Sequence, residues 1–360
     1  MCVLKLDVKC FLVLFFILAI WSFKEIPSPI PYRFPELKYF PKMPFTHNPA
    51  TVEGVDLGRF LFYDPILSEN NRISCASCHQ QKMAFSDSPN TFSKGIHGER
   101  MTRNTMPLFN LAWYPSFFWD GRAATLEQQV FIPVRAHQEM NLDWQTAVKR
   151  IEESPFYPSK FQLAFGSPKI DSVLIAKAIA QFERTLISHN SKYDQVIRGE
   201  NYFSAEEYEG FVLMNDQTKG DCLHCHITDG GVLGTTTKFS NNGLNYALIP
   251  SDYPDQGLAE TTGNVMDVGK FRIPSLRNVA VTGPYMHDGR FKSLKDVLDF
   301  YSEGVQNGWN VDRKMAYAHR GGVHLSETEK RRIIAFLGTL TDSTFLSNPD
   351  FSNPFPIKTN

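Results

Sequence analysis

Cysteine is scarce in this sequence, with six among 360 residues. Cys2 and Cys10 lie at the extreme N-terminus, and the other four cysteines belong to two Cys-x-x-Cys-His pentads, at residues 75–79 and 222–226. Once the pentads are set aside, the folded body has no cysteines left for the disulfide framework that stabilises many small exported proteins. The sequence therefore predicts that the cysteines of the folded body hold cofactors.

A strong charge of either sign is also absent. The formal net charge is −1, and charged residues make up 21% of the chain. Nucleic-acid-binding proteins usually carry a marked positive excess. The composition therefore gives no argument for a nucleic-acid partner.

Strand-like alternation of apolar and polar residues is scarce as well. Apolar residues instead recur at helical spacing over residues 52–64, 143–154 and 172–187. Further helices are expected where a Ser-x-x-Glu/Asp capping box opens an apolar run. These boxes are Ser204 with Glu207, Ser293 with Asp296, and Ser326 with Glu329. The predicted fold is mainly α, with long loops and little β.

The two pentads favour covalent haem attachment, in which both thiols add to the porphyrin and the adjacent imidazole ligates the iron. Composition alone predicts about 0.003 such patterns by chance in this chain, which has two. A zinc ribbon would bring its cysteine pairs within about 15–20 residues. A thioredoxin motif would follow a buried apolar strand, which residues 68–74 do not supply. The sequence therefore predicts two haem c groups, held by Cys75, Cys78, His79, Cys222, Cys225 and His226.

Residues 1–27 contain an apolar run, from Cys10 to Phe23, that follows two lysines. The run is short for a membrane-spanning helix and suits the central part of an export signal. No small-x-small cleavage site follows it, so an uncleaved membrane anchor is the alternative. Residues 28–45 form a Pro-rich linker that separates this segment from any core. Both alternatives predict a periplasmic protein, either free or anchored to the inner membrane.

An internal repeat organises the rest of the chain. Residues 108–126 align without a gap on residues 276–294, a constant offset of 168, and both copies contain an Asp-Gly-Arg turn. Matches in one register predict the duplication of a single-haem unit. We therefore expect two c-type cytochrome-like haem domains, at residues 46–190 and 200–345, followed by a tail at residues 346–360.

The two halves differ at positions where a side chain could act on the haem iron or on a molecule bound to it. The offset pairs Tyr301 with Pro133, and tyrosine can ligate iron whereas proline cannot. The amide of Gln129 and the carboxylate of Glu139 occur in the first half only. A haem with an open axial position binds small molecules such as peroxide, whereas a filled position favours electron transfer. These differences predict a reactive N-terminal haem and an electron-storing C-terminal haem.

From about Leu57 to Asp342 the sequence resembles the bacterial di-haem cytochrome c peroxidases, including the MauG-type enzymes. The resemblance rests on linked strings: "CASCH", "RNTMPLFNLAW", "FWDGRAATLEQQ", "QEM", "QFERTLISHNSKYD", "CLHCH" and "GKFRIPSLRNVAVTGPYMHDGRFKSL". It implies a peroxidatic N-terminal haem and a C-terminal haem that passes electrons. By motif position it implies an inter-haem tryptophan, a distal glutamine, a distal-side proline and an acid–base glutamate. These are Trp119, Gln129, Pro133 and Glu139.

The resemblance also implies ligands for metal ions. The haem irons would be held by His79 and His226, with Tyr301 as the outer ligand of the second haem, as in MauG-type members. This ligand replaces the methionine of the better-known peroxidases. A calcium ion would be bound by three residues, the last two through backbone carbonyls: Asn104, Thr282 and Pro284. In many relatives a distal histidine blocks the first iron, and here His97 and His137 are rivals for that role.

Three functions stay open at this stage. The first is reduction of H₂O₂ with a small cytochrome c or cupredoxin as the electron donor, and the breadth of the family favours it. In this reaction Gln129 would orient the peroxide, and Glu139 would carry a proton between its oxygens. The second is a MauG-type oxidation of residues in a partner protein, which Tyr301 favours. The third is plain electron transfer without catalysis. The protein would act either alone or as a homodimer.

Overall fold

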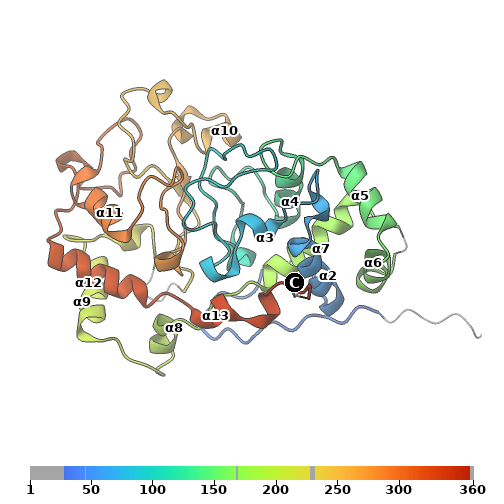
Figure 1. Cartoon of the computed structure of the whole chain (residues 1–360). Helices are drawn as coiled ribbons and strands as arrows, with labels where there is room; N and C mark the ends of the chain where they lie inside the picture. Colours follow the sequence, from blue (N-terminus) through green and yellow to red (C-terminus); the bar gives the residue numbers. More distant parts are fainter. Residues whose placement is uncertain (1–27, 45, 168, 228–231, 357–360) are drawn as a thin grey trace, which may run out of the picture.

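The computed structural model describes residues 28–44, 46–167, 169–227 and 232–356. Two helical lobes lie side by side and are joined by long loops (Figure 1). The only strands in the described ranges are β1 (Phe239–Ser240) and β2 (Phe271–Arg272), which pair antiparallel. The prediction of a mainly α fold with little β is confirmed. The predicted export signal or anchor at residues 1–27 lies outside the described residues.

Five longer helices build the N-terminal lobe, and helix α7 lies at its centre, packed against α2, α4 and α5. Eight of the 14 residues of α7 are strong helix formers, namely alanine, leucine, lysine, glutamine, glutamate and arginine, and its N-terminus is capped by Asp171. The apolar periodicity at residues 52–64, 143–154 and 172–187 is confirmed as α2, α5 and α7. The helices are α2 (Val52–Tyr63), α4 (Leu126–Arg135), α5 (Trp144–Glu153), α6 (Tyr157–Phe165) and α7 (Ser172–Thr185).

A glycine allows α2 to approach α7 closely. A Cβ atom on Gly58 would lie 1.9 Å from the carbonyl oxygen of Ala178, a distance that no real side chain tolerates. The buried residues Leu57 and Leu61 stand beside it and pack into the core of this lobe. The short helix α3 (Cys75–Cys78) contacts α2, so the first pentad is held against this core.

The C-terminal lobe is built mainly on α9 (Ala205–Asn215) and α12 (Glu327–Gly338), which pack together. Here too a glycine permits the contact, because a Cβ on Gly210 would lie 2.0 Å from the Arg332 carbonyl oxygen. All three predicted capping boxes are confirmed, at the starts of α9, α11 and α12. Further elements of this lobe include α10 (Ala259–Thr262), α11 (Leu294–Asp299) and the π-helical turn η8 (Phe300–Gly304).

The two repeat segments adopt matching conformations at the predicted offset. The isolated bridge between Phe117 and Ala123 in the first copy corresponds to the bridge between Tyr285 and Phe291 in the second. Asn110 and Asn278 both have a φ of 54°, and a 3-10 turn follows each of them: η3 (Leu111–Trp113) and η7 (Val279–Val281). The alignment thus has a structural counterpart, while common origin by duplication stays a prediction.

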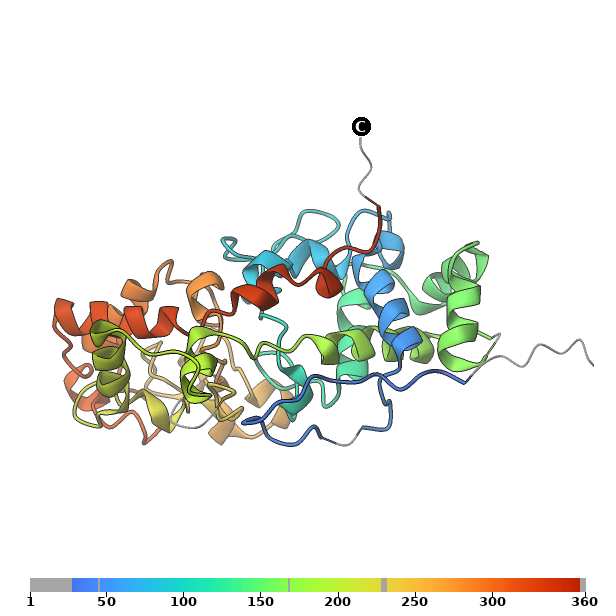
Figure 2. The same cartoon turned by 90° about the horizontal axis from the view of Figure 1, so that it is seen from below.

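Two segments connect the lobes, one in the middle of the chain and one near the end of its described part. Helix α8 (Lys192–Ile197) carries Tyr193 into the core of the C-terminal lobe. Helix α13 (Ser343–Ser347) returns to the N-terminal lobe, where Phe345 and Phe351 join the core (Figure 2). The predicted domain bounds stay predictions. Within the described residues, no helix combines the length and the apolar character needed to cross a membrane.

Candidate functional site

The first pentad opens onto a cavity of about 720 Å³ in the N-terminal lobe, next to the second lobe. Cys75, Cys78 and His79 all line it. The Nδ1 atom of His79 lies 2.7 Å from the backbone carbonyl oxygen of Phe85. Because a carbonyl oxygen can only accept, Nδ1 must carry the proton, which leaves Nε2 with its lone pair free. An imidazole held in this way is prepared to ligate a metal.

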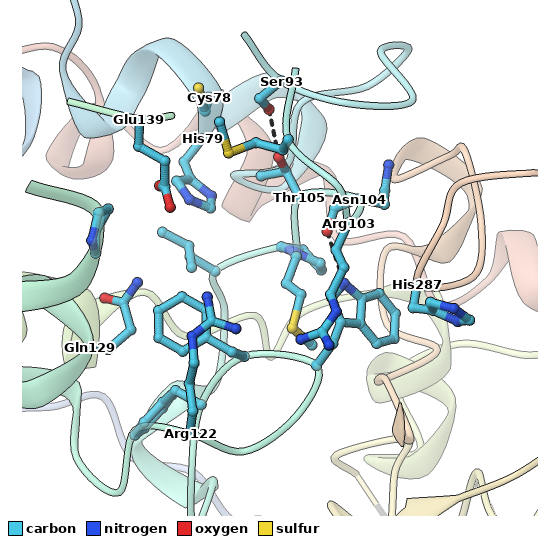
Figure 3. Close-up of a pocket in the computed structure, with 18 of the residues that line it drawn as sticks. Cys78, His79, Ser93, Arg103, Asn104, Thr105, Arg122, Gln129, Glu139 and His287 are labelled. Carbon is cyan, nitrogen blue, oxygen red and sulfur yellow. Dashed lines mark hydrogen bonds between the residues drawn. The ribbon is translucent and has the colours of Figure 1, made fainter. Parts of the chain in front are cut away.

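Glu139, Gln129 and Pro133 line the same cavity. Gln129 and Pro133 lie on α4, and Glu139 lies in the turn that follows it. Figure 3 shows the side chains of Glu139 and Gln129 pointing into the cavity that His79 enters. The Glu139 turn is pinned to a neighbouring loop, because the backbone amide of Ile96 donates to the Glu139 carbonyl at 2.9 Å. The predicted acid–base residue Glu139 and the predicted peroxide-orienting residue Gln129 therefore share one cavity.

Burial raises the pKa of the Glu139 carboxyl, and the positive charge of Arg122 opposes this rise. Arg122 lines the cavity as well. Its guanidinium is held by the carboxylate of Asp120, at 2.8 Å, and lies 3.8 Å from the centre of the Phe118 ring. A carboxyl with a raised pKa keeps its proton to a higher pH than an exposed carboxyl does, and a group of this kind that faces a cavity is a candidate for acid–base chemistry.

The second pentad opens onto a separate cavity in the C-terminal lobe, lined by Cys222, Cys225 and His226. The Nδ1 atom of His226 lies 3.0 Å from the Pro274 carbonyl oxygen, so this imidazole also keeps Nε2 free. Burial lowers the pKa of His226 to about 4, which keeps the ring neutral and able to ligate. Both pentads therefore present the same pair of thiols and the same kind of histidine.

Tyr301 lines the second cavity together with His226. It lies in the π-helical turn η8, a form often found at functional sites. Its hydroxyl accepts a hydrogen bond from the side-chain amide of Asn242 at 3.0 Å. Burial raises the pKa of Tyr301 to about 12 in the protein without a metal. Pro133, its counterpart in the repeat, lines the first cavity.

Trp119 lines both cavities and is only 8% exposed. Its indole N–H donates to the Asn104 carbonyl at 2.8 Å. The backbone amide of Asn104 in turn donates to the carbonyl of His287, at 2.7 Å. His287 also lines both cavities, and its ring stacks on Phe271 with the ring centres 3.6 Å apart. Trp119 thus stands between the two predicted haem sites.

The three residues predicted to bind calcium are only partly linked in the structure. Asn104 is buried, and its side-chain amide donates to the Thr91 carbonyl at 2.9 Å. The bond from Asn104 to His287 joins it to the segment that contains Thr282 and Pro284. The Thr282 hydroxyl faces the Val279 carbonyl at 3.4 Å. The described residues contain no group of three or more His, Cys, Asp or Glu side chains suited to a metal ion.

Neither rival for a distal histidine belongs to the lining of the first cavity. The ring of His97 pairs with the carboxylate of Glu69 at 3.0 Å, and its side chain is 42% exposed. His137 is more exposed and lies near the Asn141 amide, at 3.3 Å. The two imidazoles lie 5.0 Å apart on the surface. In this structure neither ring borders the space that a blocking ligand would occupy.

Sequence reasoning missed several charged residues of the cavity linings, among them Arg122, Glu183 and Arg272. Arg272 lines both cavities and is 2% exposed, and its guanidinium donates to the Phe118 carbonyl and the Ser116 hydroxyl. Glu183 is buried, and its Oε2 atom has no partner among the described residues. Burial raises the pKa of Glu183 to about 8. In the sequence, the only indication that Arg122 has a role was its place in the repeated Asp-Gly-Arg motif.

Whether these cavities fit a haem can be judged from their donors. Each is lined by two free thiols and one imidazole with a free nitrogen, which is the set that haem c requires. The first volume falls in the range of about 300–1,000 Å³ common to cofactor sites. The second cavity measures about 220 Å³. The side chains that line the second cavity must therefore move apart before a porphyrin ring can enter. The thiols and imidazole of each cavity nevertheless match the set that haem c requires.

Comparisons with known proteins agree with this chemistry. The family model "Di-haem cytochrome c peroxidase" matches residues 52–202. The methylamine utilization protein MauG of Methylorubrum extorquens is 35% identical over 86% of this chain and 83% of the relative. The cytochrome c551 peroxidase of Nitrosomonas europaea is 32% identical over 85% of this chain and 84% of the relative. A solved MauG-like protein associated with microbial copper homeostasis is 34% identical, with a TM-score of 0.80 over 90% of this chain and all of the other.

The relatives and the solved structure match 85–90% of the chain, so the agreement extends into both lobes. Relatives that share this extent carry the names of cytochrome c peroxidases and of MauG. The chain is therefore an oxidoreductase that belongs to the di-haem cytochrome c peroxidase family, MauG-type members included, and this membership implies two haem c groups.

Proposed function

We propose that this protein reduces hydrogen peroxide to water in the N-terminal cavity, with electrons that enter through the C-terminal site. The observation that carries the proposal is the meeting of His79, Gln129 and Glu139 on one cavity. Trp119 borders that cavity and the second one. The amide and the carboxylate that line the second cavity have other partners, since Asn242 donates to the Tyr301 hydroxyl and Asp221 pairs with the His224 ring.

The proposed haem attachment uses the two pentads. Cys75 and Cys78 would form the thioethers of the first haem, and His79 would ligate its iron through Nε2. Cys222, Cys225 and His226 would do the same for the second. A bound haem supplies a redox-active iron that reacts with peroxide and that accepts and passes on single electrons.

Glu139 and Gln129 would handle the substrate. The Gln129 amide can donate to one peroxide oxygen and so orient the molecule. Glu139, when deprotonated, can take the proton from one oxygen and return it to the other as the O–O bond breaks. The raised pKa of Glu139 supports this role, because an acid–base group works best when its pKa lies near the working pH.

Electron supply would come from outside the protein. A small periplasmic cytochrome c or cupredoxin would donate at the C-terminal lobe, and Trp119 would connect the two centres. The buried position of Trp119, with its indole N–H fixed by the Asn104 carbonyl, supports a rigid connection. A periplasmic location follows from this proposal, as does export of the chain.

A calcium ion between the lobes is part of the proposal. Asn104, Thr282 and Pro284 would supply oxygen ligands, as the hard Ca²⁺ ion prefers. The hydrogen bonds of Asn104 to Trp119 and His287 support a link between such an ion and the inter-haem region. Removal of calcium by a chelator would then change the coupling of the two haems.

A MauG-type oxidation of a partner protein is a second candidate, and Tyr301 favours it. A phenolate ligand stabilises ferric iron and lowers the potential of the second haem relative to a thioether ligand. Such a centre is less suited to storing electrons for peroxide reduction. The position of Tyr301 on the second cavity supports this candidate.

Electron paramagnetic resonance of the ferric protein at low temperature tests the proposal. Stoichiometric H₂O₂ is then added without reductant. We expect a high-spin signal beside a low-spin one, both lost on peroxide addition. Tyr301→Phe should change the low-spin signal only, if Tyr301 ligates the second iron.

Turnover with a reduced donor separates the candidate functions. Continuous peroxide consumption with a small reduced cytochrome would support the peroxidase. Loss of both signals without turnover would favour the MauG-type reaction. Two low-spin signals that peroxide leaves unchanged, with no turnover after partial reduction, would contradict both and indicate a plain electron carrier.

A further inference from the structure

Arg272 is a buried cation that borders both cavities. It belongs to the short strand β2 of the C-terminal lobe and is 2% exposed. The linings of the first and the second cavity both include it, so it lies between the two predicted haem sites. Its backbone amide donates to the Trp119 carbonyl at 2.9 Å. Arg272 is therefore fixed beside the residue that connects the two sites.

The Arg272 guanidinium is held in place by neutral acceptors. Its Nε atom donates to the Phe118 carbonyl at 3.1 Å and its Nη2 atom to the Ser116 hydroxyl at 2.6 Å, both in the first lobe. Its Nη1 atom donates to the Thr237 carbonyl at 3.2 Å. A guanidinium has five N–H donors in a planar fork, so two donors are left after these three hydrogen bonds. The group is thus oriented without being saturated.

The charge of Arg272 has no carboxylate in contact with it among the described residues. Burial lowers the pKa of Arg272 to about 10, and the charges of Tyr114 and Asp120 oppose that fall. Asp120 itself forms ion pairs with Arg103 and Arg122. A buried charge costs free energy unless a partner of opposite charge compensates for the lost water. The carboxyl side chain of Asp120 supplies only part of that compensation.

The acidic residues that line the cavities do not supply the missing partner. Four of the six are ion-paired with other side chains: Asp255 and Glu260 with Arg103, Asp288 with Arg290, and Asp221 with His224. The other two are Glu139 and Glu183, and burial raises the pKa of both carboxyls, which disfavours their charged forms. A carboxylate that binds Arg272 must therefore come from a molecule in the cavities.

Haem itself carries carboxylates of this kind. A haem c group has two propionate side chains, at the porphyrin edge opposite its thioethers. Figure 3 shows Arg122 at the end of the first cavity that lies away from Cys78. The Arg122 guanidinium lies 3.8 Å from the centre of the Phe118 ring, and Arg272 donates to the Phe118 carbonyl. Arg272 is therefore placed toward the edge of the first haem that carries the propionates.

We propose that Arg272 is a carboxylate-binding site shared by the two haems, with one remaining N–H donor for a propionate of each. Arginine suits this role because its planar fork binds carboxylates with a fixed geometry. A positive charge beside both haems favours the ferrous form of each iron, so Arg272 raises both reduction potentials together. The inference rests on haem attachment at the two pentads, and it holds for either reaction considered above.

The test compares holoprotein variants that differ at one arginine. Arg272→Gln removes the charge, and Arg272→Lys keeps the charge but loses the planar fork. Arg150→Gln is the matched control, because Arg150 also donates to backbone carbonyls but lines neither cavity. A redox titration followed by haem absorbance gives the two midpoint potentials. Resonance Raman spectroscopy follows the propionate bending bands, which respond to hydrogen bonds at the carboxylates.

We expect Arg272→Gln to shift the equilibrium of each haem about tenfold toward the ferric form, a fall of about 59 mV for one electron. The propionate bands should move in the same variant. Arg272→Lys should keep both equilibria within about twofold of wild type, because the charge remains, yet it should still move the bands. Arg150→Gln should change neither measurement.

Unchanged propionate bands in both Arg272 variants would overturn the carboxylate site. A change in the potential of one haem only would overturn the sharing of Arg272 between the two. If Arg272→Gln does not fold, the bands of Arg272→Lys decide the question, because they are expected to move as well.

Failure of this inference is distinguishable from failure of the proposed function. The mass of the wild-type protein reports how many haems are covalently attached, and fewer than two would overturn attachment and the sharing with it. Two attached haems with unchanged bands would overturn the role of Arg272 alone. Neither measurement uses peroxide or an electron-donor protein, so the absence of peroxide turnover would leave the result for Arg272 unaffected.

Discussion

At the scale of single residues, the pKa of the Glu139 carboxyl is set by two opposing effects, burial and a neighbouring positive charge. Burial disfavours its charged form and raises its pKa, while the nearby Arg122 guanidinium favours that form. Neither effect is visible in the isolated string "QEM". The balance between them decides how much of Glu139 is available as a base at a given pH.

Replacement of Glu139 should slow peroxide turnover without affecting the covalent attachment of the haems. Glu139→Gln keeps the size of the side chain but cannot carry a proton, so peroxide turnover should fall about 10²–10⁴-fold. Glu99→Gln, an exposed glutamate on a nearby loop, is the matched control and should leave turnover unchanged. Steady-state kinetics measures both, and the haem spectrum reports attachment. Full activity in Glu139→Gln would refute the assigned role.

Removal of the Arg122 charge should move the pH profile upward. Because Arg122 lowers the Glu139 pKa, its loss raises that pKa further, and Glu139 becomes a base only at higher pH. In Arg122→Gln the ascending limb of kcat/KM against pH should therefore shift to higher pH. Arg122→Lys retains the charge and should restore the limb. A downward shift in Arg122→Gln would contradict this electrostatic account.

At the scale of helices, each lobe depends on a close contact that only glycine permits. Gly58 lets α2 meet α7, and Gly210 lets α9 meet α12. Within the α2–α7 pair, α7 contributes Glu183 to the lining of the first cavity. Helix α2 contacts the short α3, which contains the two cysteines of the first pentad. The helix pair therefore sets the walls around the predicted haem.

A methyl group at Gly58 should force the two helices apart. Its Cβ would meet the Ala178 carbonyl oxygen, part of a backbone that cannot move aside cheaply, so Gly58→Ala should cost about 1–3 kcal/mol or more. Gly338→Ala, near the end of α12 with no heavy atom within 4 Å, should instead be neutral or gain up to ~1 kcal/mol. Urea unfolding of the holoprotein measures both. Equal stability of the two variants would argue against the contact.

At the scale of the whole molecule, the C-terminal end of the chain supports the N-terminal site. Phe345 on α13 is 2% exposed and packs against Phe85, with the ring centres 5.7 Å apart. The Phe85 carbonyl holds His79 by its Nδ1 atom. The Gln81 side chain also donates to the Asn348 carbonyl at 2.7 Å. The last described residues thus act on the proximal side of the first cavity.

Truncation of Phe345 should therefore disturb the distant N-terminal haem. Phe345→Ala should destabilise the N-terminal lobe by about 3–5 kcal/mol and alter the paramagnetic resonance signal of the haem held by His79. Phe336→Ala, equally buried but in the C-terminal lobe, should destabilise that lobe and leave the signal unchanged. Identical effects of the two variants on the first haem would contradict the proposed support.

The sequence alone determined those features that depend on neighbouring residues or on covalent chemistry. Helical periodicity at residues 52–64 and the Ser204 box were readable because caps and apolar stripes are set within a few residues of the chain. The pentads were readable because haem attachment requires thiols and imidazole at fixed spacing. Family membership followed from linked motifs of this kind.

Only the tertiary structure decided which distant residues share a cavity. Trp119 borders both cavities, Arg272 reaches across from the other lobe, and His97 pairs with Glu69 outside the lining of the first cavity. The same holds for residues 313–320, which lie beside the second pentad through the contact of Lys314 with the His224 carbonyl. These relations arise when burial of apolar side chains brings the lobes together, so no local pattern in the sequence contains them.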